Sequence, residues 1–265
     1  MERITKNTRT VIIGAGNVAT HMAKALRMRL NIIQIFSHDI ENAHILANSI
    51  DCTCFTSSID DISKDADIYI IAIKDDAIES LISKISNFTH SSLWVHTSGS
   101  KPMTVFEGKM NNYGVFYPLQ TFSKNVEVNF QEIPIFVEAN DTKNIEQIKE
   151  LAHLLSPKVY DADSDRRRQL HIAAVFACNF ANHLWTISDE LLRDTNLPFS
   201  ILMPLIRASV NKLDKVSPAQ SQTGPAVRND TKVIEKHLSM LSDNKKEIYK
   251  TLTNSIIDSA NKTNL

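Results

Sequence analysis

The chain has 265 residues, of which 43% are hydrophobic and 22% charged, and its formal net charge is −1. This length suits one large or two medium domains, and the composition is that of an ordinary globular protein with enough apolar residues for a core. The near-zero charge gives no electrostatic reason to expect a nucleic acid or an anionic membrane as partner. We therefore expect a small-molecule ligand.

The sequence predicts neither a signal peptide nor a membrane span. The first eight residues contain no apolar core, and no later run approaches the roughly 18 apolar residues of a membrane helix. We therefore expect a cytoplasmic protein. The three cysteines, Cys52, Cys54 and Cys178, are odd in number and lack the spacing of a common zinc site, which predicts reduced thiols and no metal.

A glycine turn between a strand and a helix is the motif on which the functional prediction depends. An apolar run ends at Gly14, and an amphipathic stretch begins near Asn17. Gly14 can adopt the backbone angles of a tight turn, Gly16 lets a pyrophosphate approach the main chain, and Ala19 permits close packing of helix on strand. The free amides of the helix would then face the phosphates. The predicted dinucleotide loop consists of Gly14, Ala15, Gly16, Asn17 and Val18; the alternative is an ordinary structural turn.

The end of the second apolar strand, residues 31–36, indicates which dinucleotide fits. Enzymes that use NAD usually place an acid about 20 residues after the glycines, where it binds the ribose 2′-hydroxyl. Ser37 stands at that position and His38 follows it, and these side chains can accommodate a 2′-phosphate. We therefore expect NADP, as NADPH, and regard NAD as less favoured. Two alternatives stay open: Asp39 is the ribose-binding acid if the register differs by two residues, or it caps the next helix.

Further strands alternate with helical stretches in the first half of the chain. They are expected over residues 67–73, 93–96, 113–117 and 133–138, and this alternation is typical of a parallel sheet built from βαβ units. Ligands of such sheets bind beyond the carboxyl ends of the strands, so we expect Ile73, Lys74 and Ser98 to contact the cofactor. From Asp161 onward only helices are predicted. The predicted fold class is α/β, with a Rossmann-type, mostly parallel sheet domain over residues 1–155 and an all-α helical domain over residues 156–265.

Polar residues lie on one face of the apolar helix predicted after Asp161. At about 100° per residue, Asn182 lies about 20° from His171 around the helix, and Arg168 and Asn179 lie within about 80°. One interpretation is structural, in which these groups bond loop carbonyls where the domains meet. In the other they line a cleft, His171 acts as general acid or base, and Ser98, Asn179 and Asn182 position the substrate. The run of arginines before His171 reads mainly as a solvated face paired with aspartates.

Five stretches of the chain together resemble one protein family. They are Gly14–Ala19, His96–Ser100, Gly114–Phe122, Leu170–Asn179 and Gln222–Arg228. They resemble the NADP oxidoreductases that join a Rossmann-like domain to a helical domain of unknown function. More distantly, the chain resembles pyrroline-5-carboxylate reductase, ketopantoate reductase and 6-phosphogluconate dehydrogenase, whose helical domain completes the active site and the dimer. The resemblance implies a homodimer formed through the helical domain.

One similarity to the distant relatives and one departure from them concern the reaction. The turn Thr223–Pro225 is similar to a substrate-binding turn of the reductase branch, whereas His171 stands where the dehydrogenase branch would have a catalytic lysine. The leading hypothesis is an NADP-dependent oxidoreductase that transfers a hydride between nicotinamide and a small polar carbonyl or imine. The alternatives are a dinucleotide-binding sensor or regulatory subunit without catalysis, and a reductase for another redox cofactor such as a deazaflavin.

Overall fold

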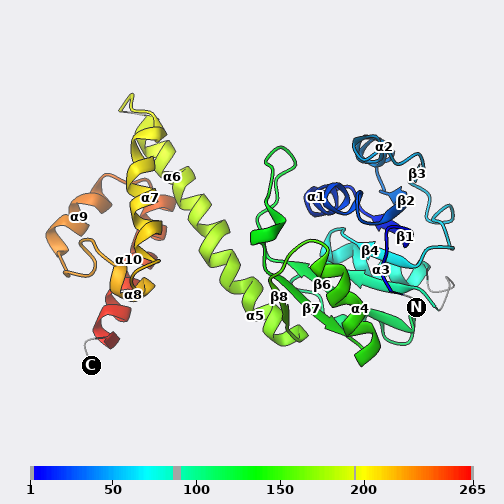
Figure 1. Cartoon of the computed structure of the whole chain (residues 1–265). Coiled ribbons are helices and arrows are strands. Elements are labelled where there is room, and N and C mark those ends of the chain that lie inside the picture. The colour runs from blue at the N-terminus through cyan, green and yellow to red at the C-terminus, as the bar shows by residue number, and fades with distance from the viewer. Residues whose placement is uncertain (1–2, 86–90, 194, 264–265) are drawn as a thin grey trace. The chain divides into compact units, whose positions relative to one another are not determined.

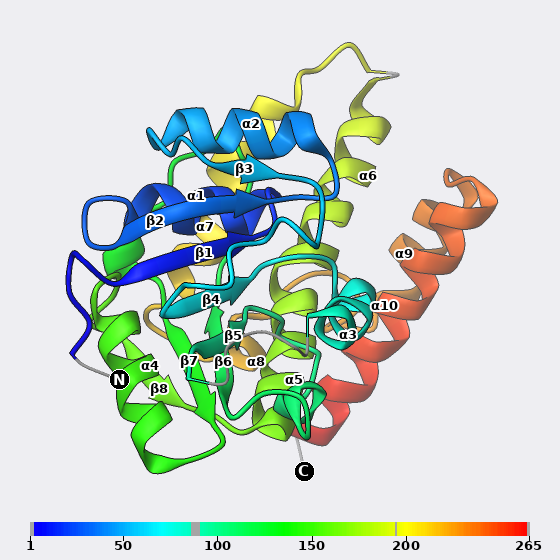
Figure 2. The same cartoon turned by 90° about the vertical axis from the view of Figure 1, so that its right-hand side faces the viewer.

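The structure, a computed structural model, describes residues 3–85, 91–193 and 195–263. An eight-stranded sheet with the order β3-β2-β1-β4-β5-β6-β7-β8 organises the first part of the chain (Figures 1 and 2). Neighbouring strands from β3 to β6 are parallel, β7 is antiparallel to β6, and β8 is parallel to β7. The strands are β1 (Arg9–Ile13), β2 (Asn31–Phe36), β3 (Phe55–Thr56), β4 (Ile68–Ile71), β5 (Leu93–His96), β6 (Asn112–Pro118), β7 (Ile135–Ala139) and β8 (Val159–Asp161).

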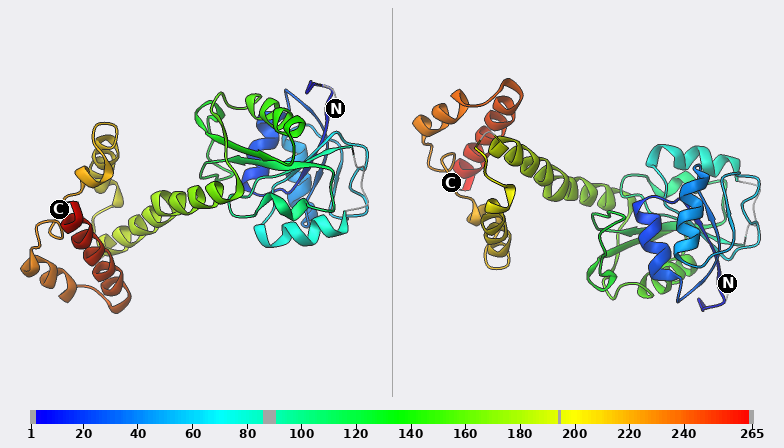
Figure 3. Two further views of the ribbon diagram at one scale, coloured as in Figure 1. Left: turned by 90° about the horizontal axis from the view of Figure 1, so that it is seen from below. Right: turned by 90° about the horizontal axis from the view of Figure 1, so that it is seen from above.

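Helices cover both faces of the sheet because successive strand residues point to opposite sides. On β1, Ile12 packs with the small residues of α1 (Asn17–Leu26) and α2 (Ile40–Ser49). Its neighbours Val11 and Ile13 pack on the other face against α3 (Asp75–Lys84) and the short helix η1 (Met103–Phe106). The helix α4 (Thr142–His153) shares the α1 face, and Figure 3 shows α4 in green and α3 in cyan on opposite sides of the sheet. The strands are continuous apolar runs because both faces are buried.

The chain divides into two compact units, Met1–Cys178 and Asn179–Leu265. The first contains the whole sheet, including β8, which lies beyond residue 155 where we expected the sheet domain to end. It also contains η2 (Phe130–Glu132) and α5 (Ser164–Ala174). The second unit is helical, so the predicted class is confirmed: a mostly parallel, Rossmann-type sheet followed by helices. Its helices are α6 (Ala181–Arg193), η4 (Phe199–Leu202), α7 (Met203–Lys212), α8 (Pro218–Ser221), α9 (Thr231–Ser239) and α10 (Asp243–Thr263).

A π-helical turn, Val175–Phe180, follows α5 directly. A π turn contains more residues than an α turn, so each residue advances less than 100° around the axis. The rotation of 100° per residue that predicted a face shared by His171 and Asn182 therefore does not apply across this turn. Among the described residues, no helix is both long enough and apolar enough to span a membrane.

Candidate active site

A cavity of about 860 Å³ lies at the edge of the sheet where β1, β2, β4, β5 and β6 end. This volume is within the range of about 300–1,000 Å³ that is usual for ligand pockets. All ten residues predicted to bind the cofactor line it, as does His171. The ten are Gly14, Ala15, Gly16, Asn17, Val18, Ser37, His38, Ile73, Lys74 and Ser98.

The glycine turn forms the middle of this cavity. Gly14 has φ +127°, and its amide donates to the carbonyl of Phe36 at 2.7 Å. A Cβ at Gly14 would overlap the carbonyl oxygen of Ala72, so only glycine fits between β1 and the end of β4. A Cβ at Gly16 would meet no atom within 4 Å, and no side chain caps the first turn of α1. The backbone amides of the first turn of α1 are therefore available to bind a phosphate.

At one end of the cavity, Ser37 follows directly after β2. Asp39 is the N-cap of α2, where its carboxylate accepts hydrogen bonds from the amides of Glu41 (3.0 Å) and Asn42 (3.1 Å). The bond from the Asn42 amide holds the pKa of this carboxyl below its usual range. Of the two alternatives for Asp39, the structure therefore has the helix cap, and Asp39 is absent from the cavity lining.

At the other end of the cavity, Tyr117 and His171 form a pair that brings β6 and α5 together. The Tyr117 hydroxyl and His171 Nδ1 lie 3.1 Å apart and share a hydrogen bond. Burial raises the pKa of the Tyr117 phenol, which therefore stays protonated at neutral pH. Gly99 makes this approach possible, because a Cβ there would lie 2.7 Å from His171 Nδ1 and 2.7 Å from Tyr117 Cζ.

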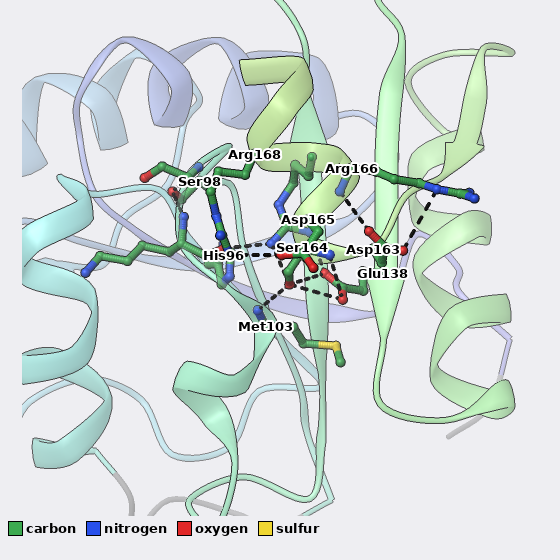
Figure 4. A network of polar contacts seen from close by, with 12 residues as sticks. His96, Ser98, Met103, Glu138, Asp163, Ser164, Asp165, Arg166 and Arg168 are labelled. Atoms are coloured by element: carbon green, nitrogen blue, oxygen red, sulfur yellow. Dashed lines mark hydrogen bonds and ion pairs between the residues drawn. The ribbon is translucent and has the colours of Figure 1, made fainter. Parts of the chain in front are cut away.

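The buried guanidinium of Arg167 holds the start of α5 against the sheet. Its side chain is 1% exposed, forms an ion pair with Glu138 of β7, and donates to the Lys101 carbonyl at 2.6 Å. Ser164 completes the network by donating to Glu138 and accepting from the Met103 amide at 3.0 Å (Figure 4). The first turn of α5 is thus bonded both to β7 and to the loop that follows β5.

This network also holds the part of α5 that carries His171. Arg167 and His171 are four residues apart, on the same face of α5, and about 6 Å apart along its axis. Glu138 pairs with Val115 in the sheet, and Val115 is two residues, about 6.6 Å, before Tyr117. The two residues of the sheet that α5 contacts, Glu138 beside Val115 and Tyr117 two residues further along β6, therefore lie at neighbouring positions of the sheet.

His96 lies behind the cavity as a neutral, fully buried histidine. Its Nδ1 accepts a hydrogen bond from the Ser98 amide at 3.2 Å. Burial lowers the pKa of His96 to about 3, and the positive charge of Arg167 acts in the same direction. His96 is therefore neutral at physiological pH and shapes the turn at Ser98. The Ser98 hydroxyl, in turn, accepts from the amides of Ser100 (3.1 Å) and Lys101 (3.0 Å).

The remaining predicted residues have different surroundings. Asn179 and Asn182 belong to the second unit and their side chains are exposed, so their contact with a substrate stays a prediction. Arg168 is half-exposed and pairs with Asp165 at 3.2 Å, as expected of a solvated arginine, whereas Arg167 is the buried member of the run. Sequence reasoning missed Tyr117 and Arg167. The largely apolar run of residues 113–117 indicated a strand and gave no sign of a functional phenol.

Two protein-family profiles match the chain. Residues 9–98 match the family described as "NADP oxidoreductase coenzyme F420-dependent", and residues 133–256 match "Domain of unknown function (DUF2520)". No curated protein matches the chain. Among solved structures, a candidate NADP oxidoreductase from Bacteroides fragilis is 44% identical, with a TM-score of 0.91 over 96% of this chain and 99% of its own.

The chain belongs to this NADP oxidoreductase family. Less similar structures share its fold. One is a pyrroline-5-carboxylate reductase from Streptococcus pyogenes, with a TM-score of 0.63, 14% identity and coverage of 97% of this chain and 99% of its own. Another is an imine reductase from Myxococcus stipitatus in complex with NADP+, with a TM-score of 0.65, 13% identity and coverage of 96% and 93%. The family resemblance predicted from the sequence is confirmed.

The charges that line the cavity of this oxidoreductase suit an anionic cofactor. Of the described residues in the lining, Lys74, Lys84 and Lys124 are cationic and Asp75 alone is acidic. Asp75 is engaged by a hydrogen bond from the Ser100 hydroxyl. A dinucleotide carries at least two phosphate charges, so three lysines and the open first turn of α1 provide a matching positive field.

Proposed function

We propose that the protein is an NADP-dependent oxidoreductase that transfers a hydride between nicotinamide and a small polar carbonyl or imine. The observation that carries the proposal is the cavity, which extends from Ser37 through the glycine turn to the Tyr117–His171 pair. Strand β2, which Ser37 follows, and strand β6, which bears Tyr117, are four strand spacings apart in the sheet, about 19 Å. This length accommodates an extended dinucleotide, with adenosine near Ser37 and nicotinamide near Tyr117 and His171.

The proton chemistry follows from the Tyr117–His171 hydrogen bond. NADPH, when bound, would supply the hydride to the substrate carbon. With protons on both ring nitrogens, His171 donates from Nδ1 to the Tyr117 oxygen and keeps its Nε2 proton for transfer. His171 can give this proton to the substrate nitrogen or oxygen as the carbon–heteroatom double bond is reduced, which leaves a neutral imidazole, and Tyr117 stabilises the tautomer that remains, with its proton on Nδ1. Ser98 also lines the cavity, and its hydroxyl, which accepts from two backbone amides, keeps its own proton to donate to the same substrate atom.

Replacing His171 with asparagine should reduce turnover of any substrate about 100-fold or more, because proton transfer by a positioned side chain contributes about 10²–10⁴-fold. Tyr117→Phe should give a smaller loss of about tenfold, because the imidazole stays but loses the partner that fixes its tautomer. Stopped-flow oxidation of NADPH with a panel of imines and carbonyls measures both. Affinity for NADPH, measured by fluorescence titration, should change less than threefold in either variant, on the order of the smallest effects expected for uncharged contacts.

Two results would contradict these assignments. Unchanged turnover in His171→Asn would remove His171 from the mechanism. Failure of the wild-type protein to bind NADPH or NADH at millimolar concentration would remove the proposed function itself. A protein that binds NADPH and reduces nothing in a broad panel would instead be the dinucleotide-binding sensor considered above.

A reductase for a deazaflavin is a second candidate, favoured by the description of the family that matches residues 9–98. It uses the same sheet edge, with the deazaflavin ring as hydride partner of the nicotinamide. Mixing the protein, NADPH and the oxidised deazaflavin distinguishes the candidates. Rapid loss of the deazaflavin absorbance favours the second, and its persistence, together with reduction of an imine or a carbonyl, favours the first.

We also propose that the helical unit forms a homodimer and that Asn179 and Asn182 orient the substrate. Of the described residues in Asn179–Leu265, only Ala226 and Thr253 are buried, so this unit has no core of its own. Large apolar residues stay exposed along its helices, among them Leu205 (65%), Val210 (56%) and Leu213 (50%). Surfaces of this kind mark protein interfaces, and a second copy of the same chain offers complementary helices.

Light scattering should therefore give twice the mass of one chain, which is 29.8 kDa. Leu205→Glu should shift the mass toward one chain, because it buries a charge in the interface. Met28→Glu is the matched control, since Met28 is equally exposed at 67% but belongs to the first unit, and it should leave the mass unchanged. A wild-type protein with the mass of one chain at micromolar concentration would disprove the dimer.

A further inference from the structure

An irregular segment between β6 and η2, residues 119–129, reaches back to the first two helices of the sheet domain. We call it the strap. Figure 1 shows it as a green loop beside α1. Three consecutive residues tie it down: the Phe122 carbonyl accepts from Asn17 Nδ2 at 2.8 Å, and the Ser123 carbonyl accepts from His21 Nε2 at 2.9 Å. The third, Lys124, donates from its ammonium group to Asn42 Oδ1 at 3.2 Å.

The strap belongs to the cavity wall rather than to the outer surface alone. Gln120, Phe122 and Lys124 all line the cavity, together with the glycine turn and the end of β2. Phe122 is further fixed by its ring contacts with His21, at 5.3 Å between centroids, and with Phe130, at 6.1 Å. Two of the strap's three partners, Asn17 and His21, lie in the first two turns of α1, so the strap runs next to the first-turn amides of α1.

Lys124 brings a cation to the end of the cavity near Ser37, because its ammonium group contacts Asn42. Asn42, its partner, is in the first turn of α2 and lines the same end of the cavity as Ser37 and His38. Asn42 uses its amide nitrogen to donate to Asp39 Oδ2 at 2.7 Å, which leaves its oxygen for Lys124. Asp39 is held as a helix cap and Lys124 contacts an amide oxygen, so the ammonium charge is available to a ligand.

We infer that Lys124 pairs with the phosphate on the adenosine ribose of NADP and thereby sets the preference for NADP over NAD. This inference rests on the proposed function, because it assumes a dinucleotide whose adenosine lies at Ser37. In NADP enzymes, a cationic side chain near the end of the second strand commonly binds the 2′-phosphate. Here Lys124 supplies that cation from a position 87 residues after Ser37 in the sequence, and Ser37 and His38 provide further hydrogen-bonding groups in the same lining.

The test compares binding of NADPH, NADH and 2′,5′-ADP to the full-length protein by calorimetry. The third ligand carries the phosphate without the nicotinamide, so its affinity reports this end of the cavity alone. Lys124→Met should lower the affinities for NADPH and 2′,5′-ADP about 10–100-fold, as expected when a charged hydrogen bond is lost. The affinity for NADH should fall less than about threefold, because NADH lacks the 2′-phosphate. Lys124→Arg should restore most of the affinity for both phosphate-bearing ligands.

Lys143→Met is the matched control. Lys143 is an exposed residue of α4 outside the cavity lining, so its removal makes the same change in net charge without touching the site. Its three affinities should equal those of the wild type. Equal weakening of NADPH and NADH in Lys124→Met, or an unchanged ratio between them, would overturn the inference and leave the proposed function standing. Absence of dinucleotide binding in the wild type would instead overturn the proposed function.

Discussion

Arg167→Met should lower the free energy of unfolding by about 3–5 kcal/mol, because removing one partner of a buried ion pair leaves the other charge uncompensated. The side chain of Arg167 is 1% exposed and that of Glu138 is 15% exposed, so solvent screens this pair little. The Lys101 carbonyl would also lose the hydrogen bond that it accepts from Arg167. Urea unfolding followed by circular dichroism measures the change.

The neighbouring arginine provides the control. Arg168→Met removes a half-exposed partner of Asp165, and such surface pairs contribute only about 0–1 kcal/mol. The double variant Arg167→Met with Glu138→Met should recover part of the lost stability, since both buried charges are then absent. Equal costs for Arg167→Met and Arg168→Met would show that the Glu138 network does not anchor α5.

Gly14→Ala should lower the free energy of unfolding by about 3 kcal/mol or more, because φ +127° is strained for any residue with a side chain. The added Cβ would also overlap the Ala72 carbonyl oxygen and lie 2.8 Å from its carbon, and neither backbone atom can move without disturbing β4. Dinucleotide affinity should fall with it, since the turn could not keep its shape. Urea unfolding and NADPH titration measure the two effects.

Gly16→Ala separates stability from binding. Gly16 has φ −78°, and a Cβ added there would meet no protein atom within 4 Å. The free energy of unfolding should therefore change by no more than about 0.5 kcal/mol. The same methyl group would occupy space beside the first turn of α1 and should weaken NADPH binding. A Gly14→Ala variant as stable as Gly16→Ala would contradict the steric account of the turn.

The parts of the fold that depend on local sequence were predictable. The glycine turn, the apolar strands and the change to helices each leave a pattern within a few consecutive residues, and the structure has all three. The three-residue β8 was missed because Val159–Asp161 is too short for a periodicity and is held in place by its pairing with β7. The compact unit therefore continues past residue 155, to Cys178.

The site depended on contacts that no local pattern encodes. Three successive arginines look alike in sequence, and only the direction in which α5 leaves the sheet decides that Arg167 meets Glu138 while Arg168 faces solvent. Tyr117 and His171 are 54 residues apart, and Lys124 and Asn42 are 82 apart. Such pairs become visible only when strand order and register bring them together.

The anchoring of α5 has a consequence for how this family can diversify. The residues that fix His171, namely Tyr117, Gly99, Arg167 and Glu138, all belong to Met1–Cys178. The proposed acid is therefore held by contacts that substitutions in Asn179–Leu265 do not remove. Members of this family can retain one proton donor while their second units vary.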